Sequence, residues 1–278
     1  DLTAGAWSAG QTTPLPIEAG FTLSVGGQRL LEQVKIRTSL TFGASTLHLS
    51  ETRLATRVHA AGLATDGVPL ALEFAAASLD PGRASYRLPS LRVALGTARL
   101  ELRELAFEQP EAAPPKAGAA FSLAPTSLRA LLLTLGIEPP RTADARALES
   151  FAVDGRFALE AGTLTIEPLT LVLDDTRLIG RVSRGGEPAV AQFSLAGNAM
   201  NLDRYLEPDD VESAPFKFPG AALGALRARG TLALETATFD DLAFEGLVVR
   251  LLFDEQGLRG DPAAAAAPTP ATTPGRAP

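Results

Sequence analysis

The chain has no cysteine, one tryptophan, two tyrosines, two histidines and three lysines among its 278 residues. Without cysteine it can form neither disulfide bonds nor thiolate metal sites. Its formal net charge is −7 and it has no long run of basic residues, which argues against a nucleic-acid binder. The strongest apolar stretch, 130–137, is far shorter than the roughly 20 residues that a membrane-spanning helix needs.

The residue types that build most catalytic sites are scarce as well. His48 and His59 lie in alternating segments with no nucleophile motif or carboxylate pair beside them, so we interpret them as solvated residues on strand faces. Acidic doublets occur at 174–175, 209–210 and 240–241, where the chain is expected to turn, and they lack the spacing of a calcium loop. We therefore predict a protein that is not an enzyme and that holds no cofactor or metal; a carbohydrate-active enzyme is the weakest alternative.

Alternation of apolar and polar residues dominates the sequence and predicts about a dozen strands. Short turn signals such as Asp66-Gly67 and Asp80-Pro81-Gly82 separate them, and the connections look too short for helical crossovers. The predicted fold is mostly β: an elongated, curved antiparallel β-meander that forms an open groove, with one or two short helices.

An apolar sheet face must curl, pack against a second sheet or hold an apolar ligand. The alternating apolar residues that would line such a groove are Leu47, Leu49, Leu54, Val58, Leu91, Val93, Leu95, Leu169, Leu171, Leu173, Phe193, Leu195, Leu232 and Leu234. Arginines on the opposite faces, such as Arg53 and Arg99, are expected to form solvated cross-strand pairs, with contact to anionic headgroups as the alternative.

One segment has helical rather than strand spacing. Leu128, Leu131, Leu132 and Leu135 recur at helical intervals, with Ser127 placed to cap the start and Gly136 the end. A second, shorter helix is expected at 142–148. Residues 155–164 and 230–239 also resemble each other, which suggests a repeated hairpin.

These patterns predict an N-terminal antiparallel β segment at 1–108, a Pro/Ala linker at 109–119, a helix-then-β segment at 120–261 and a disordered Pro/Ala tail at 262–278. The chain starts at Asp1 without methionine. We therefore expect it to begin inside a longer protein, with any signal sequence or membrane anchor upstream.

A set of motifs in fixed order spans 127–208. It comprises Leu135-Gly136-Ile137, Thr142-Ala143-Asp144 after Pro140, Leu173-Asp174-Asp175-Thr176 followed by Leu178-Ile179-Gly180, and Leu202-Asp203-Arg204-Tyr205-Leu206. In this order and spacing the segment resembles the AsmA family of bacterial envelope proteins. Residues 226–260 resemble the region that follows in that family, whereas the N-terminal half is similar only in its general strand-rich pattern.

The resemblance implies a periplasmic protein tethered to the inner membrane by an N-terminal helix, which is absent from this sequence. Family members look like bridge-like lipid transfer proteins whose curled sheet shelters phospholipid acyl chains between the inner and outer membranes. The family is also associated with outer-membrane protein assembly, so an envelope protein partner is possible. On this resemblance Gly136, Asp174, Asp175, Asp203, Arg204 and Tyr205 have structural roles, and Asp203 is expected to cap a short helical turn.

The sequence leaves two functions open. The first is phospholipid handling in a hydrophobic β-groove, with acyl chains and the inner membrane as partners and no nucleic acid. The second is a scaffold or interaction module that assists outer-membrane protein assembly through its sheet edges without bound lipid.

Overall fold

A computed structural model describes residues 2–4, 14–25, 28–59, 66–186, 189–206, 227–254, 257–264 and 269–270. The chain divides into two units. Unit 1 consists of residues 1–139 and 152–166, and unit 2 consists of residues 140–151 and 167–278. The predicted boundary at 109–119 is wrong, because residues from Lys116 onward form a strand that pairs with the strand before the loop.

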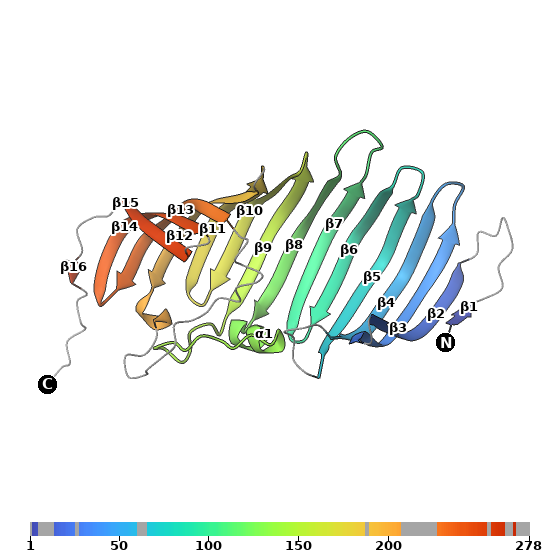
Figure 1. The fold of residues 1–278 in the computed structure, drawn as a ribbon, viewed down its shortest axis with the longest axis horizontal. Coiled ribbons are helices and arrows are strands. Elements are labelled where there is room, and N and C mark those ends of the chain that lie inside the picture. Colours follow the sequence, from blue (N-terminus) through green and yellow to red (C-terminus); the bar gives the residue numbers. More distant parts are fainter. Residues whose placement is uncertain are drawn as a thin grey trace. The chain divides into compact units, whose positions relative to one another are not determined.

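The strands of unit 1 follow one another in the sheet in chain order (Figure 1). They are β1 (Leu2–Ala4), β2 (Leu15–Val25), β3 (Gln28–Phe42), β4 (Leu47–Val58), β5 (Val68–Asp80), β6 (Ser85–Leu95), β7 (Ala98–Glu108), β8 (Lys116–Thr126) and β9 (Phe151–Glu160). The registers from β1 to β8 are all antiparallel. The loops β3–β4, β5–β6 and β7–β8 therefore lie at one end of the strands, and the chain leaves β8 at the other end.

The predicted helix is confirmed as α1 (Leu128–Thr134), which follows β8. The Ser127 side chain accepts a hydrogen bond from the backbone N–H of Ala130, as an N-cap residue does. Gly136 has a φ of 71°, and the N–H groups of Gly136 and Ile137 donate to the Leu133 and Leu132 carbonyls. Gly136 therefore ends the helix in the left-handed conformation that glycine favours.

Unit 2 contains the remaining strands, also in chain order. They are β10 (Thr163–Leu173), which begins in unit 1, β11 (Thr176–Gly185), β12 (Val190–Asn201), β13 (Arg227–Phe239), β14 (Leu242–Asp254), β15 (Gly257–Ala264) and β16 (Thr269–Pro270). The 3-10 helix η1 (Asp203–Tyr205) follows β12. The predicted turns at 174–175 and 240–241 are confirmed, whereas the doublet at 209–210 lies outside the described residues.

The predicted antiparallel meander is broken at one place. Strands β12 and β13 pair in parallel, with Leu195 opposite Leu232. Parallel neighbours need a long connection, and residues 202–226 provide one. The fold class is otherwise confirmed: a mostly-β, mostly antiparallel, open curved sheet with one short α-helix in the described residues.

Two smaller expectations are also wrong, and a third is tested only in part. Residues 142–148 form turns rather than a helix, and Leu148 has a φ of 66°, which a helix does not allow. The proposed repeat fails because 155–164 crosses the turn at Ala161–Gly162, whereas 230–239 lies within one strand. The predicted tail begins inside β15, and most of it lies outside the described residues.

β-Bulges keep the apolar side chains of unit 1 on one face. In β4, Leu47 and Leu49 occupy odd positions while Leu54 and Val58 occupy even ones, yet all four are half-buried. Between them Glu51 has a φ of 50°, where the β3–β4 register shifts. Similar positive-φ residues, Gln33 and Glu104, mark register shifts in β3 and β7. Such bulges also bend and twist a strand, which explains the curvature of the sheet.

Candidate functional site

Apolar side chains form an unbroken face across unit 1. Strand pairing places one row of them side by side over six strands: Ile36, Leu54, Leu72, Val93, Leu100 and Leu123. All six are half-buried. Parallel rows flank this one, for example Leu40 with Leu49 and Leu91 with Leu102. We call this side of the sheet the apolar face of unit 1.

The apolar face is not filled by the protein's own side chains. Among the described residues only Val34 and Val68 are large and almost completely buried. The candidate groove residues of unit 1, from Leu47 to Leu95, are all half-buried. A sheet packed under a second layer would bury such leucines. The face therefore keeps apolar area that an apolar ligand can cover.

Unit 2 brings four of the predicted residues together. Leu195 lies opposite Leu232, Phe193 opposite Gly230, and Leu234 opposite Leu247. Leu234 is 3% exposed and Leu169, in β10, is 8% exposed, whereas the other predicted residues in unit 2 are half-buried: Leu171, Leu173, Phe193, Leu195 and Leu232.

Glycines make room for the large side chains of unit 2. A Cβ on Gly230 would collide with the backbone carbonyl oxygen of Phe193 and lie 2.6 Å from Cγ of its ring, and one on Gly197 would meet Leu178 and Leu234. Large and small residues therefore interlock around Phe193 and Leu234, as in a close-packed protein interior.

The opposite face of unit 1 carries a charged row. Strand pairing aligns Glu18, Arg37, Arg53, Glu73, Arg92, Glu101 and Ser122 across seven strands. Arg37 Nε donates to Glu18 Oε1 at 2.7 Å, and Arg53 lies 3.7 Å from Glu73. These side chains are more than half exposed, so each pair contributes little stability.

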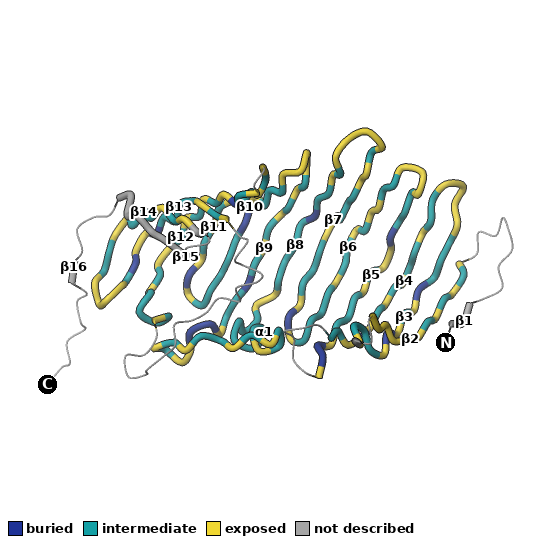
Figure 2. The backbone as a smooth tube through the Cα atoms, viewed as in Figure 1, coloured by how far each residue is buried: buried dark blue, intermediate teal, exposed yellow. Residues whose placement is uncertain are grey.

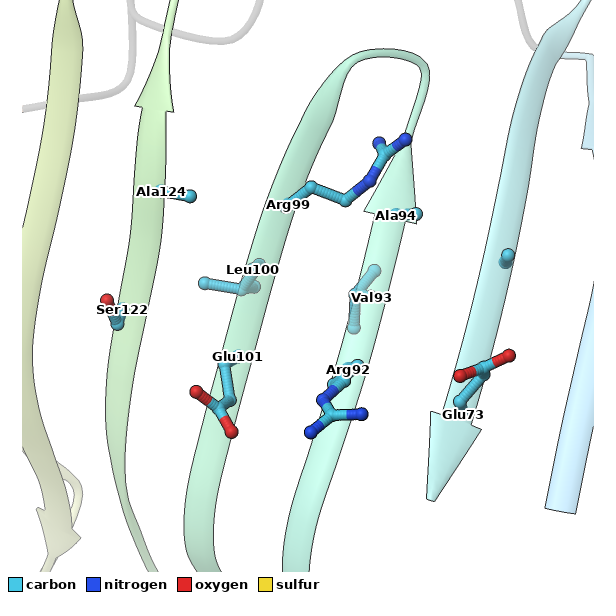
Figure 3. Close-up of a pocket in the computed structure, with 10 residues that line it drawn as sticks. Glu73, Arg92, Val93, Ala94, Arg99, Leu100, Glu101, Ser122 and Ala124 are labelled. Carbon is cyan, nitrogen blue, oxygen red and sulfur yellow. The ribbon is translucent and has the colours of Figure 1, made fainter. Parts of the chain in front are cut away.

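Three hollows of about 450, 580 and 480 Å³ lie along this charged row. Figure 3 shows the first, where Arg92 and Glu101 project from neighbouring strands. Arg99 does not form the expected cross-strand pair, because its guanidinium donates to the Gly96 and Ala98 carbonyls. Hollows on the polar face were not predicted from the sequence, although a row of small residues, including Ala71 and Ala94, is a signal for them.

The motif residues of unit 2 meet in one cluster. Arg204 bonds to Asp144 and Asp175 at 2.8 and 2.7 Å. The Tyr205 hydroxyl donates to Asp174 at 2.9 Å. We call these residues, together with Asp203, the corner cluster. It joins residues 140–150, the β10–β11 turn and η1, and only the likeness of the motifs to a family had singled out its members.

Asp174 organises the corner cluster through the backbone. Its carboxylate accepts hydrogen bonds from the N–H groups of Leu148, Glu149 and Ser150 at 2.8–3.0 Å. Burial raises the pKa of Asp174, but these bonds and the one from Tyr205 outweigh it and hold the pKa below its usual value. Burial, and then the Asp174 carboxylate, raise the pKa of Tyr205. The tyrosine therefore stays protonated and keeps donating.

Asp203 does not cap its own helical turn, because Leu202 occupies that position and makes no side-chain bond. Its carboxylate instead accepts hydrogen bonds from the Asp240 and Asp241 N–H groups at 2.7 and 3.1 Å. The motif thus fastens the β13–β14 turn to η1. Gly136 is separate from the cluster and only ends α1.

The two histidines differ in their surroundings. His48 is exposed, as predicted. His59 is 21% exposed and its Nε2 lies 2.9 Å from Glu32 Oε2, so the interpretation of a solvated histidine is wrong there. Among the described residues no group of histidine, cysteine and acidic side chains could hold a metal ion.

We found no match to this chain among protein-family models, curated proteins or solved structures.

Proposed function

We propose that the chain shelters lipid hydrocarbon on the apolar face of its open sheet. The observation that carries the proposal is the row from Ile36 to Leu123, which crosses six strands and leaves every one of its side chains half-buried. Hydrocarbon is the ligand that gains most from such a surface, because it offers continuous apolar contact and no specific polar partner.

The free energy gained by covering an acyl chain is large enough to support binding. Burying hydrocarbon gains about 0.8 kcal/mol per CH₂, so hiding half the surface of a ~16-carbon chain gains about 6 kcal/mol. No catalytic group is needed, and the corner cluster is occupied by its own hydrogen bonds. The proposed function is therefore non-enzymatic phospholipid handling, and the likeness of the motifs to the AsmA family supports a periplasmic protein anchored to the inner membrane.

Over the part of the chain that the structure describes, no helix has the length and hydrophobicity to cross a bilayer. The phospholipid acyl chains are the ligand, and the inner membrane is the source or destination.

A second candidate function is a scaffold for outer-membrane protein assembly. The hollows beside Arg37 and Arg92 favour it, because a polypeptide can use both their charged and their small side chains. Under this hypothesis the polar face carries the function and the apolar face binds no lipid.

Neighbouring residues on opposite faces of β5 provide the test. Leu72 belongs to the apolar face and Ala71 to the polar face. Binding of a fluorescent fatty acid to the purified chain should be lost in Leu72→Asp and retained in Ala71→Asp, with circular dichroism confirming that both fold. If the wild type binds no fatty acid and lipid extraction yields no phospholipid, the proposal is refuted.

A further inference from the structure

The outermost row of the apolar face is aromatic. At the end of the strands opposite α1, strand pairing aligns Phe42, Leu47, Leu79, Tyr86, Phe107 and Ala117 across β3 to β8. The Tyr86 and Phe107 rings are neighbours, with centroids 5.6 Å apart. We call this row the aromatic rim. Aromatic residues form only 6% of the chain, so three in one row are a concentration.

The two ends of the apolar face differ in exposure. Away from the rim, Val34 and Val68 are each 1% exposed, and at the end of the strands where α1 lies a Cβ on Gly96 would be 2.8 Å from Thr134. At the rim, Phe42 is 43% and Tyr86 42% exposed. On β3 to β8, Phe42 and Tyr86 are the only exposed large apolar side chains among the described residues, and both lie at the rim; on β2, Phe21 is 46% exposed.

The three loops next to the rim carry almost no charge. They are residues 43–46, 81–84 and 109–115, which Figure 1 shows along one edge and Figure 2 shows as mostly exposed. Their only charged residues are Arg83 and Glu111, which have opposite signs. Beside the rim, Arg87 pairs with Glu108 at 3.3 Å. This edge of the sheet therefore has no net charge with which to attract an ionic partner.

We propose that the aromatic rim docks unit 1 on a bilayer of zwitterionic phospholipid, and that lipid passes between the bilayer and the apolar face at this edge. The inference rests on the proposed function, because the rim is continuous with the face that would hold the acyl chains. Tyrosine and phenylalanine beside short uncharged loops suit the boundary between headgroups and hydrocarbon. Because the loops are neutral, an uncharged bilayer surface fits them better than an anionic one.

Flotation of the protein with phosphatidylcholine vesicles tests the proposal. We expect the wild type to bind, and Phe42→Ser with Tyr86→Ser to weaken binding about tenfold or more, since exposed aromatic area no longer enters the bilayer. The matched control is Phe21→Ser, a phenylalanine of similar exposure on β2 and outside the rim, which should retain binding. If the wild type does not bind, or Phe21→Ser loses as much as the rim variant, the proposal is overturned.

A fluorescence experiment adds a positive signal, which a misfolded variant could not produce merely by failing to bind. In a chain carrying Trp7→Phe, the change Tyr86→Trp places a single tryptophan at the rim, and Leu133→Trp places one on the exposed side of α1. Vesicles should shift the emission of the rim tryptophan to shorter wavelength and leave that of the α1 tryptophan unchanged. A shift at residue 133 without one at residue 86 contradicts the proposal.

A soluble fatty acid separates this inference from the function on which it rests. The rim variant should still bind monomeric fluorescent fatty acid, because the rows nearer α1 remain intact. If the wild type binds vesicles through the rim but takes up no fatty acid, the lipid-handling function fails and membrane docking stands. If it takes up fatty acid but does not bind vesicles, the rim inference alone fails.

Discussion

Replacing Asp174 by asparagine should destabilise unit 2 more than the neighbouring change Asp175→Asn. The Asp174 carboxylate accepts three backbone hydrogen bonds and one from Tyr205. Hydrogen bonds to charged groups each contribute roughly 1.5–3 kcal/mol, and asparagine keeps one acceptor oxygen but turns an NH₂ group toward an N–H donor. We therefore expect a loss of about 3 kcal/mol.

Asp175→Asn is the matched control. The Asp175 side chain is 90% exposed, and it pairs with Arg204 at 2.7 Å. An exposed pair of this kind contributes less than about 1 kcal/mol. The two substitutions make the same chemical change at adjacent positions of one turn. The difference between their free energies of unfolding therefore reports the additional hydrogen bonds that the Asp174 carboxylate accepts.

Urea unfolding followed by circular dichroism measures both variants. The free energy of unfolding falls by roughly 3 kcal/mol per molar urea, so Asp174→Asn should lower the transition midpoint by about 1 M urea and Asp175→Asn by about 0.3 M. Tyr205→Phe should cost about 1 kcal/mol alone and almost nothing on the Asp174→Asn background. Equal midpoints for the two asparagine variants would refute the role given to Asp174.

Two further predictions concern unit 2. The fold lowers the pKa of Asp174 from 3.8, so the stabilisation by this carboxylate is complete above pH 3.8 and is lost as the pH falls through the pKa of the folded state. Urea titrations at falling pH should therefore show that the wild type loses more stability than Asp174→Asn. Equal losses would contradict the lowered pKa. Gly230→Ala should destabilise by roughly 2 kcal/mol or more, because its Cβ would press on Phe193, whereas Gly20→Ala, whose Cβ has only an ordinary contact 3.7 Å away, should be near neutral. Equal changes in melting temperature for the two alanine variants would contradict the close packing at Gly230.

The sequence predicted the strands because alternation is a local signal. Each strand shows its apolar face within a few residues, so Leu47 and Leu49 could be placed on one face without knowing their neighbours. The bulges could not be predicted in the same way. Glu51 is an ordinary polar residue, and only the change from odd to even apolar positions between Leu49 and Leu54 signals an extra residue there.

The parallel pairing of β12 with β13 was missed although the sequence holds a signal for it. The residues between Asn201 and Arg227 form a connection long enough for a crossover, and treating every connection as a hairpin ignored that length. The contacts of the corner cluster could not be predicted from local sequence patterns. Arg204 and Asp144 lie 60 residues apart, and nothing local in either segment indicates the other.

The hollows of the polar face could not be predicted from its charged residues. Its arginines were expected to form solvated cross-strand pairs, with contact to anionic headgroups as the alternative, and Arg53 lies beside Glu73 on the next strand as the first expectation requires. Alanines between the charged side chains, however, leave hollows that side-chain chemistry alone does not reveal. Hydropathy identifies which face is apolar, whereas side-chain size and register decide which face is hollowed.

Photo-crosslinking most directly tests whether hydrocarbon rests on the apolar face. A fatty acid carrying a diazirine near its methyl end would be bound to the purified chain, irradiated, and the labelled residues identified by mass spectrometry. The account predicts labels on the row that includes Leu54, Leu72 and Val93, competed away by unlabelled phospholipid. Labels confined to the polar face around Ala71 and Ala94, or no competed label at all, would contradict it.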